Sequence, residues 1–426
     1  MGRPIPPFGR VFNNMGILGG GGGVVTPPII YLLDDEYLDT VAPGAVNGTL
    51  ATDGSLRTAV DTGSKMSVVA ADGLTFVTGG AASGNPGVWY PTLGSILGQA
   101  LFVKIVFTSG GFQVGWDSSA TGGTRNGFGV TSTLFAIRAT GLASVGVVSA
   151  GNTYYIACIQ RAGGASLNTG MLYFIKGGAF VNWTLVYVYT TNGETTAALP
   201  NISAINTTSV FKARFARVPQ DIVAISPLVA DTFNATNGAL GNTRGIAGDG
   251  GETGGSGLPW VDDVGTWAIA TNKAGCSATA GGIGIATVDS GKTDVFIGSL
   301  ISGRTAGAAG LVTRYVDASN YICTYGDGTN VKIDKVIAGI VTNVQTTALA
   351  TVNSNFDLIA NGTAFRLLQS GSLVGAEVTI ADAALQVGTK HGLYVTDTSP
   401  KFDNFSVWAR GNLGEYETSL NPYINP

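Results

Sequence analysis

Charged side chains are scarce in this chain, and the apolar residues that replace them never form a long run. Charged residues make up 12% of the 426 residues, about half of the roughly 25% usual in soluble proteins. No stretch of about 18 apolar residues could cross a bilayer, because 64 glycines divide the apolar content into short pieces. The short apolar runs predict no membrane insertion. So few charges cannot cover a large free surface, and we therefore expect a homo-oligomer; the alternative is a Gly/Ala-rich sandwich that remains a monomer.

Basic clusters and paired cysteines are also missing. The net charge is −4, and no Lys/Arg cluster occurs, which excludes nucleic-acid binding through phosphate neutralisation. Cys158, Cys276 and Cys323 lack the spacing of a metal site, and their odd number leaves at least one unpaired. We expect them to be small buried hydrophobic residues.

The residues of common catalytic sites are hard to find. The one histidine, His391, precedes a predicted strand in a turn-like sequence, and we expect it at the surface without a triad partner. No cluster of His and Cys has zinc-ligand spacing. Glycoside hydrolysis needs two carboxylates across the scissile bond, and no predicted strand supplies such a pair. The sequence predicts a protein that is not an enzyme and needs no cofactor.

Short apolar runs separated by Gly, Asn, Asp and Ser turns make up most of the chain. This pattern has no helical period and is typical of antiparallel β-sandwiches. Hairpin signals stand at 177–178, 326–328 and 361–362. The predicted strands span 101–107, 112–116, 154–160, 172–175, 184–189 and 210–215, then 294–301, 310–316, 321–325, 356–360, 364–369, 392–395 and 405–408.

Two segments of the chain resemble each other, which indicates a duplicated domain. Residues 102–107 match 295–300, residues 211–215 match 402–405, and Asp39 in 37–40 matches Asp231 in 230–233. Residues 154–158 also align with 321–323, out of register with the rest. We predict two tandem β-sandwiches at 31–218 and 229–410, joined by a linker at 219–228 and followed by a C-terminal tail at 411–426.

Residues 1–30 form a separate segment rich in proline and glycine. Proline removes backbone donors and fixes φ, so neither a helix nor a central strand fits here. We predict an extended arm that docks on another subunit or, alternatively, stays disordered. The apolar side chains Phe8, Phe12, Ile17 and Leu18 are its expected anchors.

The second segment resembles a module of bacteriophage tail proteins with a concanavalin-like (laminin-G-like) jelly-roll fold. The matching pieces are 231–233, 238–241, 252–254, 265–269, 288–295 and 310–321. The resemblance implies an all-β jelly roll and a phage virion component, such as a minor tail, fibre or decoration protein, located on the particle surface or tail. It also implies other virion proteins as partners and host-surface glycan as a target. A stand-alone carbohydrate-binding lectin is the alternative, and a glycan hydrolase is a third.

Aromatic residues beside carboxylates are the candidates for glycan binding. Trp260 lies in a Gly-rich loop beside Asp262 and Asp263, and Tyr325 lies near Asp327. Loops on a rigid sandwich often carry binding surfaces. The alternative for each aromatic residue is packing in the core or at its edge.

Calcium is the one possible cofactor that the sequence suggests. Asp231 opens the second segment and Asp403 closes it, so their strands could be neighbours that offer oxygen ligands. The alternative is that both side chains cap turns.

Overall fold

The structure, a computed structural model, is nearly all-β: of the residues that it describes, 63% are in strands and 2% in helices. It describes residues 29–61, 63–70, 72–77, 86–91, 99–117, 126–131, 133–138, 141–160, 171–189, 199–205, 208–220, 227–244, 257–348, 353–370, 372–411 and 416–424. The predicted fold class of antiparallel β-sandwiches is confirmed. The N-terminal arm with Phe8, Phe12, Ile17 and Leu18 lies outside the described residues. No helix in the described part of the chain is long and apolar enough to cross a membrane.

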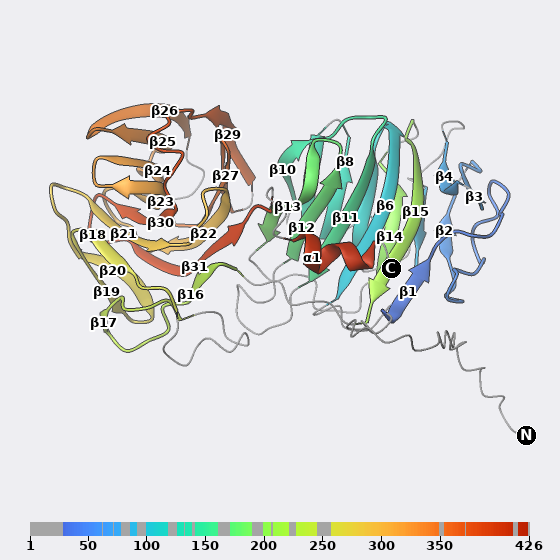
Figure 1. Cartoon of the computed structure of the whole chain (residues 1–426), viewed down its shortest axis with the longest axis horizontal. Helices are drawn as coiled ribbons and strands as arrows, with labels where there is room; N and C mark the ends of the chain where they lie inside the picture. Colours follow the sequence, from blue (N-terminus) through green and yellow to red (C-terminus); the bar gives the residue numbers. More distant parts are fainter. Residues whose placement is uncertain are drawn as a thin grey trace, which may run out of the picture.

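Strands β1 to β15, here called the first unit, form two antiparallel sheets (Figure 1). In hydrogen-bonding order the first sheet comprises β13 (Phe180–Tyr189), β12 (Met171–Gly177), β11 (Thr153–Gln160), β6 (Ala100–Ser109), β15 (Val210–Pro219), β4 (Gly73–Phe76) and β3 (Met66–Val69), with β1 (Tyr31–Asp35) also paired to β15. The second sheet comprises β10 (Gly141–Val147), β9 (Thr133–Arg138), β8 (Asn126–Val130), β7 (Phe112–Asp117), β14 (Leu199–Ala204), β5 (Gly87–Trp89) and β2 (Thr58–Val60).

Strands β16 to β31, the second unit, form the other two sheets. The third sheet comprises β17 (Gly238–Ala239), β19 (Thr266–Ala270), β20 (Lys273–Ala278), β31 (Lys401–Ala409), β22 (Val295–Ser302), β27 (Asn355–Asn361), β28 (Ala364–Gln369) and β29 (Ser372–Thr379), with β16 (Val229–Asp231) also paired to β31. The fourth sheet comprises β18 (Val261–Val264), β21 (Gly284–Asp289), β30 (Lys390–Val395), β23 (Ala309–Asp317), β24 (Asn320–Gly326), β25 (Asn330–Ile337) and β26 (Ile340–Ala348).

The strand order of the first unit recurs in the second. The series β13-β12-β11-β6-β15-β4-β3 corresponds to β29-β28-β27-β22-β31-β20-β19, and β10-β9-β8-β7-β14-β5-β2 corresponds to β26-β25-β24-β23-β30-β21-β18. The predicted alignment of 154–158 with 321–323 was therefore wrong. Residues 154–158 lie on β11, whose counterpart is β27, whereas 321–323 lie on β24, the counterpart of β8. The predicted domain boundaries stay a prediction, since 221–226 lie outside the described residues.

The residue of the first unit that is equivalent to Asp231 is Asp35, and the sequence alignment with Asp39 was wrong. Strand β1 ends at Asp35 and pairs with β15, as β16 ends at Asp231 and pairs with β31. Each aspartate accepts the backbone N–H of an aromatic residue two positions later, and these residues, Tyr37 and Phe233, have φ of 51° and 52°. The sequence alignment was four residues out of register, because it was based on similar residues and not on the turn that both aspartates stabilise.

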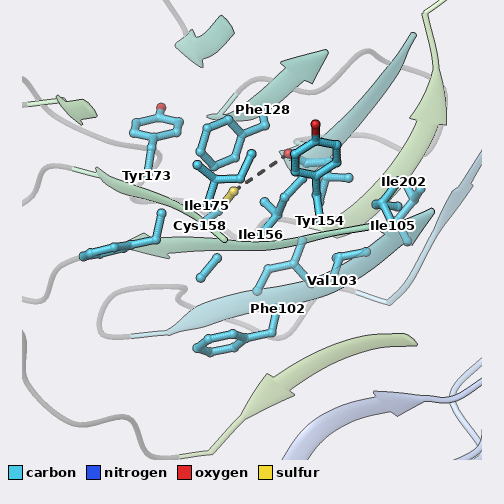
Figure 2. Close-up of a cluster of buried hydrophobic side chains, with 14 of the residues drawn as sticks. Phe102, Val103, Ile105, Phe128, Tyr154, Ile156, Cys158, Tyr173, Ile175 and Ile202 are labelled. Atoms are coloured by element: carbon cyan, nitrogen blue, oxygen red, sulfur yellow. Dashed lines mark hydrogen bonds between the residues drawn. The ribbon is translucent and has the colours of Figure 1, made fainter. Parts of the chain in front are cut away.

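Apolar side chains fill the space between the paired sheets. Figure 2 shows part of the first unit's core, in which Ile156 and Cys158 of β11 lie close to Phe128 of β8. The Cys158 thiol donates to the Val114 carbonyl oxygen at 3.9 Å. All three cysteines are buried and free, as predicted, and burial raises the pKa of the Cys158 thiol.

The C-terminal segment packs back onto the first unit (Figure 1). Helix α1 (Glu417–Leu420) leads into the 3₁₀ helix η1 (Asn421–Tyr423). Tyr416 makes an edge contact with Phe174, and Tyr423 packs on Phe102. Residues 416–424 of the predicted tail are therefore folded and pack on the first sheet of the first unit.

Candidate functional site

Tryptophan supplies no open stacking surface in this protein. All six tryptophans are buried, Trp260 with 8% of its surface exposed. Its ring packs on Phe233 and Phe405, and its indole N–H donates to the Asp231 carboxylate at 2.8 Å. The prediction that Trp260 is a sugar platform is therefore wrong, because the indole closes one end of the second unit's core.

The two aspartates that follow Trp260 have different roles. The Asp262 carboxylate accepts the backbone N–H of Trp267 at 2.9 Å, so it holds the β18–β19 turn. The Asp263 carboxylate accepts the Thr287 hydroxyl at 2.5 Å. This contact places Asp263 on the face of the fourth sheet that points away from the core.

Tyr325 and Asp327, which the sequence analysis grouped as one candidate site, also have different partners in the structure. Asp327 accepts the backbone N–H groups of Thr329 and Asn330 and forms an ion pair with Lys332 at 2.8 Å. It therefore caps the β24–β25 hairpin. Tyr325 instead donates its hydroxyl to Asp334 at 2.5 Å.

The predicted calcium ligands serve the fold. Asp231 is fully buried, and its carboxylate accepts from Phe233 N–H, from Trp260 and from the Arg244 guanidinium at 3.3 Å. Asp403 accepts the adjacent Asn404 N–H. Both are therefore local caps, and a cation already occupies one side of Asp231. Among the described residues, no group of three or more His, Cys, Asp or Glu is placed to hold a metal ion.

Four tyrosines gather on the outer face of the fourth sheet. Strand pleating places alternate residues on opposite faces. Ile322 of β24 and Leu393 of β30 point into the core between the sheets, whereas their neighbours belong to a separate cluster on the other face. We name this surface the tyrosine face: Tyr315, Tyr321, Tyr325 and Tyr394, with Asp263 and Asp334.

Ring contacts and hydrogen bonds order the tyrosine face. The rings of Tyr315 and Tyr321 stack with centroids 6.0 Å apart, and those of Tyr325 and Tyr394 lie 5.4 Å apart. Asp334 accepts the Tyr325 hydroxyl, and its other oxygen accepts the Asn343 amide at 2.7 Å. Tyr325 is partly exposed, while the other three rings are buried. The surface therefore exposes part of Tyr325, whose hydroxyl is held by the buried Asp334 carboxylate.

The electrostatics keep the hydroxyls of this face neutral. Burial raises the pKa of Tyr321 to about 12, and it also raises the pKa of Tyr325, with a further contribution from its hydrogen bond to Asp334. Burial raises the pKa of Asp263 as well, although the Thr287 hydrogen bond opposes this shift. Neutral phenols can both donate and accept hydrogen bonds, which suits a polyhydroxylated ligand.

Sequence reasoning found Tyr325 and Asp263 but not the surface that unites them. The strands β18, β23, β24, β25 and β30 bring these residues together from positions 263 to 394. The available signal was aromatic residues at alternate positions, as at Tyr321 and Tyr325 in β24. The same alternation also occurs in core strands, so it could not identify the outward face.

His391, expected at the surface, is fully buried. Its Nδ1 lies 2.9 Å from the Thr313 hydroxyl, and its Nε2 lies 2.8 Å from the Lys292 carbonyl oxygen. Burial lowers its pKa to about 4. A carbonyl only accepts, so Nε2 carries the proton and the neutral ring joins β30 to β23 and the loop before β22. The surface expectation was wrong because strand β30 begins two residues before Gly392.

No protein-family model matches the chain, and no curated protein matches it. Several solved structures share its type of fold. A carbohydrate-binding module, CBM66, from Bacillus subtilis is 21% identical, with 35% of this chain and 95% of that chain covered at a TM-score of 0.30. The galectin LEC-6 from Caenorhabditis elegans is 10% identical, with coverages of 27% and 83% and a TM-score of 0.23. The GH43 protein BlXynB from Bacillus licheniformis is 12% identical, with coverages of 79% and 86% and a TM-score of 0.27.

These matches correct one expectation and leave another unsupported. Glycosyl hydrolases stand among the similar structures, which overturns the prediction that the chain is not an enzyme. That prediction relied on missing motifs alone. At such identities and TM-scores the matches assign no activity to this chain. None of them indicates a phage origin; the matched structures include carbohydrate-binding proteins and glycosyl hydrolases.

Proposed function

We propose that this protein binds carbohydrate through the tyrosine face. The observation that carries the proposal is the group of four tyrosines and two carboxylates on a sheet face turned away from the core. Ligand sites commonly combine aromatic side chains with a few placed polar groups. The ring of Tyr325 provides apolar area for the C–H side of a sugar, and the half-buried Asp263 accepts its hydroxyl groups. The buried Asp334 carboxylate orients the Tyr325 hydroxyl.

Tyr325 and Asp334 are the residues whose replacement tests the proposal. Glycan-array screening of the whole chain would supply a ligand for calorimetric titration. Tyr325→Ala and Asp334→Asn should each weaken binding by about tenfold, the loss of one charge-assisted hydrogen bond or one stacked ring. Both should leave the thermal unfolding midpoint near that of the wild type.

Tyr155→Ala is the matched control. Tyr155 is partly exposed on the first unit, with the Lys104 ammonium 5.3 Å from its ring centroid, so it presents similar chemistry outside the tyrosine face. It should bind as the wild type does. Equal losses in all three variants, or no loss in Tyr325→Ala, would show that the tyrosines only pack against each other. Assaying the same mixtures for new reducing ends reports any hydrolysis.

The sequence resemblance supports a finer proposal, that the protein belongs to a phage virion and presents this face to host-surface glycan. Its partners would be other virion proteins and further copies of the same chain. Mass spectrometry of purified particles from the source phage would detect the chain if this is so. A stand-alone lectin would bind glycan equally well and be absent from particles.

A further inference from the structure

A cavity of about 240 Å³ lies where the two units meet. Val145 and Val147 of β10 and Phe180 of β13 form its wall from the first unit. Strands β27, β28 and β29 and the residue after β31 form the wall from the second. The volume is below the range of roughly 300 Å³ and above that is usual for drug-sized ligands, so the cavity accommodates a molecule of about monosaccharide size.

Arg410 is the buried cation of this cavity. Its side chain is 4% exposed, and its Nη1 donates to the Leu185 carbonyl oxygen of β13 at 2.6 Å. Its Nε–H is also buried, yet within the described part of the chain it has no hydrogen-bond partner. A buried donor without an acceptor costs roughly 1–3 kcal/mol. An acceptor from outside the protein would remove this cost.

The charges around the cavity do not balance. Arg366 lines it as a second guanidinium, and its Nε donates to the Glu377 carboxylate at 2.6 Å. Two cations therefore face one anion. Burial, and then the nearby Arg366, lower the pKa of Arg410 to about 10. Asp294 opposes this shift in part, but it does not line the cavity, and its carboxylate also accepts from Arg314 at 2.8 Å.

We infer that this cavity binds the carboxylate of a small organic acid, with Arg410 and Arg366 as its anion-binding residues. One carboxylate would neutralise the excess positive charge and accept the free Arg410 Nε–H, and guanidinium groups match carboxylate oxygens geometrically. The apolar side chains of Val145, Val147 and Phe180 would contact the carbon skeleton. Both units line the cavity, so the ligand would also strengthen their contact.

The probes for the test are glucuronate and glucose, which have similar size and differ by one carboxylate. Calorimetric titration of the whole chain at fixed ionic strength should show glucuronate binding at least tenfold more tightly than glucose. Cyclohexanecarboxylate is a third probe. Its binding would extend the class to acids without sugar hydroxyls, and its failure beside glucuronate would restrict the class to acidic sugars.

Two variants separate the cavity from other sites. Ala364→Leu fills the cavity from the start of β28 without changing a charge, and Arg366→Gln removes one cation; each should weaken glucuronate binding by at least tenfold. Arg410 itself is avoided because it also bonds Leu185. Equal affinity for glucuronate and glucose, or full binding by Ala364→Leu, would overturn the inference.

The tyrosine face is independent of this cavity, and Tyr325→Ala distinguishes the two. Glucuronate binding that is lost in Tyr325→Ala but retained in Ala364→Leu would refute the cavity and support the proposed carbohydrate surface. Binding retained in Tyr325→Ala and lost in Ala364→Leu supports the cavity, whatever the glycan array shows.

Discussion

Single side chains decide several properties that their sequence neighbourhoods do not reveal. His391 is the clearest case, because a lone histidine beside lysine and glycine reads as exposed, yet it is buried with two hydrogen bonds. Trp260 is another, since its Gly-rich surroundings indicate a loop tip while its ring lies in the core. Burial in both cases follows from contacts with residues distant in sequence.

The neutral His391 makes stability depend on pH. Its folded pKa of about 4 lies below the ordinary 6.5, so the unfolded state takes up the proton first. The contribution of this group is constant above pH 6.5, falls as pH drops toward 4, and then levels off after a loss of up to about 3 kcal/mol. Urea unfolding at a series of pH values measures this slope.

The variant His391→Gln isolates that slope. Glutamine can still donate and accept in the same place but does not titrate, so its stability should fall less between pH 7 and 4.5. Carboxylates that titrate in this range are common to both proteins and cancel in the comparison. Identical slopes for the two proteins would show that His391 is already protonated in the fold, or accessible to solvent.

Trp260 is predicted to stabilise the fold and not to bind ligand. Trp260→Ala should lower the free energy of unfolding by about 3–5 kcal/mol, as for other buried aromatic residues. Trp260→Phe keeps most of the packing but loses the bond to Asp231, so it should cost about 1–2 kcal/mol. Denaturant titration measures both values. A Trp260→Ala protein of wild-type stability that no longer bound glycan would restore the original platform hypothesis.

At the scale of elements, the local sequence pattern predicted some strands, whereas others depend on pairing with a neighbouring strand. Apolar strands that are buried over most of their length, such as β6 and β24, were predicted within one or two residues of their observed ends. Strand β26 was missed, because its residues are mostly exposed and show no apolar alternation. Its partner β25 supplies the hydrogen bonds that make it a strand.

Helix α1 is an element whose position depends on side chains of the first unit. Glu417 accepts from the Lys176 ammonium at 2.5 Å and from the Trp183 backbone N–H at 2.6 Å. Glu417→Gln removes the charge from both bonds and should destabilise the chain by about 1–2 kcal/mol. Raised salt should weaken the wild type more than the variant. Thermal melts at low and high salt check this, and an equal salt response would contradict it.

At the scale of the whole molecule, two sandwiches with the same strand order are joined through packed side chains. The ring of Tyr187 makes an edge contact with Phe296 at 5.8 Å. The Leu185 backbone N–H donates to the Arg410 carbonyl oxygen, and the Arg410 guanidinium donates to the Leu185 carbonyl oxygen. This contact creates the cavity between the units. The charge deficit in the sequence predicts a homo-oligomer, and that expectation stays a prediction.

The N-terminal arm is the remaining whole-molecule prediction. If residues 1–30 dock on a neighbouring subunit, Phe8 and Phe12 each contribute roughly 1.5–3 kcal/mol of burial. The double change Phe8→Ala and Phe12→Ala should reduce incorporation into particles or oligomers, measured by sedimentation. Arg3→Ala with Arg10→Ala is the matched control and should have little effect. Unchanged assembly of the phenylalanine variant would favour a free arm.

The sequence by itself determined the fold class, most long strands and their hairpin turns, because period-two alternation and Gly or Asn turns act over a few residues. Only the tertiary structure decided which face each strand turns outward, where His391 and Trp260 lie, and that Tyr315, Tyr325 and Tyr394 share one surface. These outcomes depend on strand order and on sheet pairing between residues far apart in sequence, such as Val229 with Val407 and Gly284 with Val395. Local sequence carries no record of such contacts, since the same alternating residues serve either a core or a binding face.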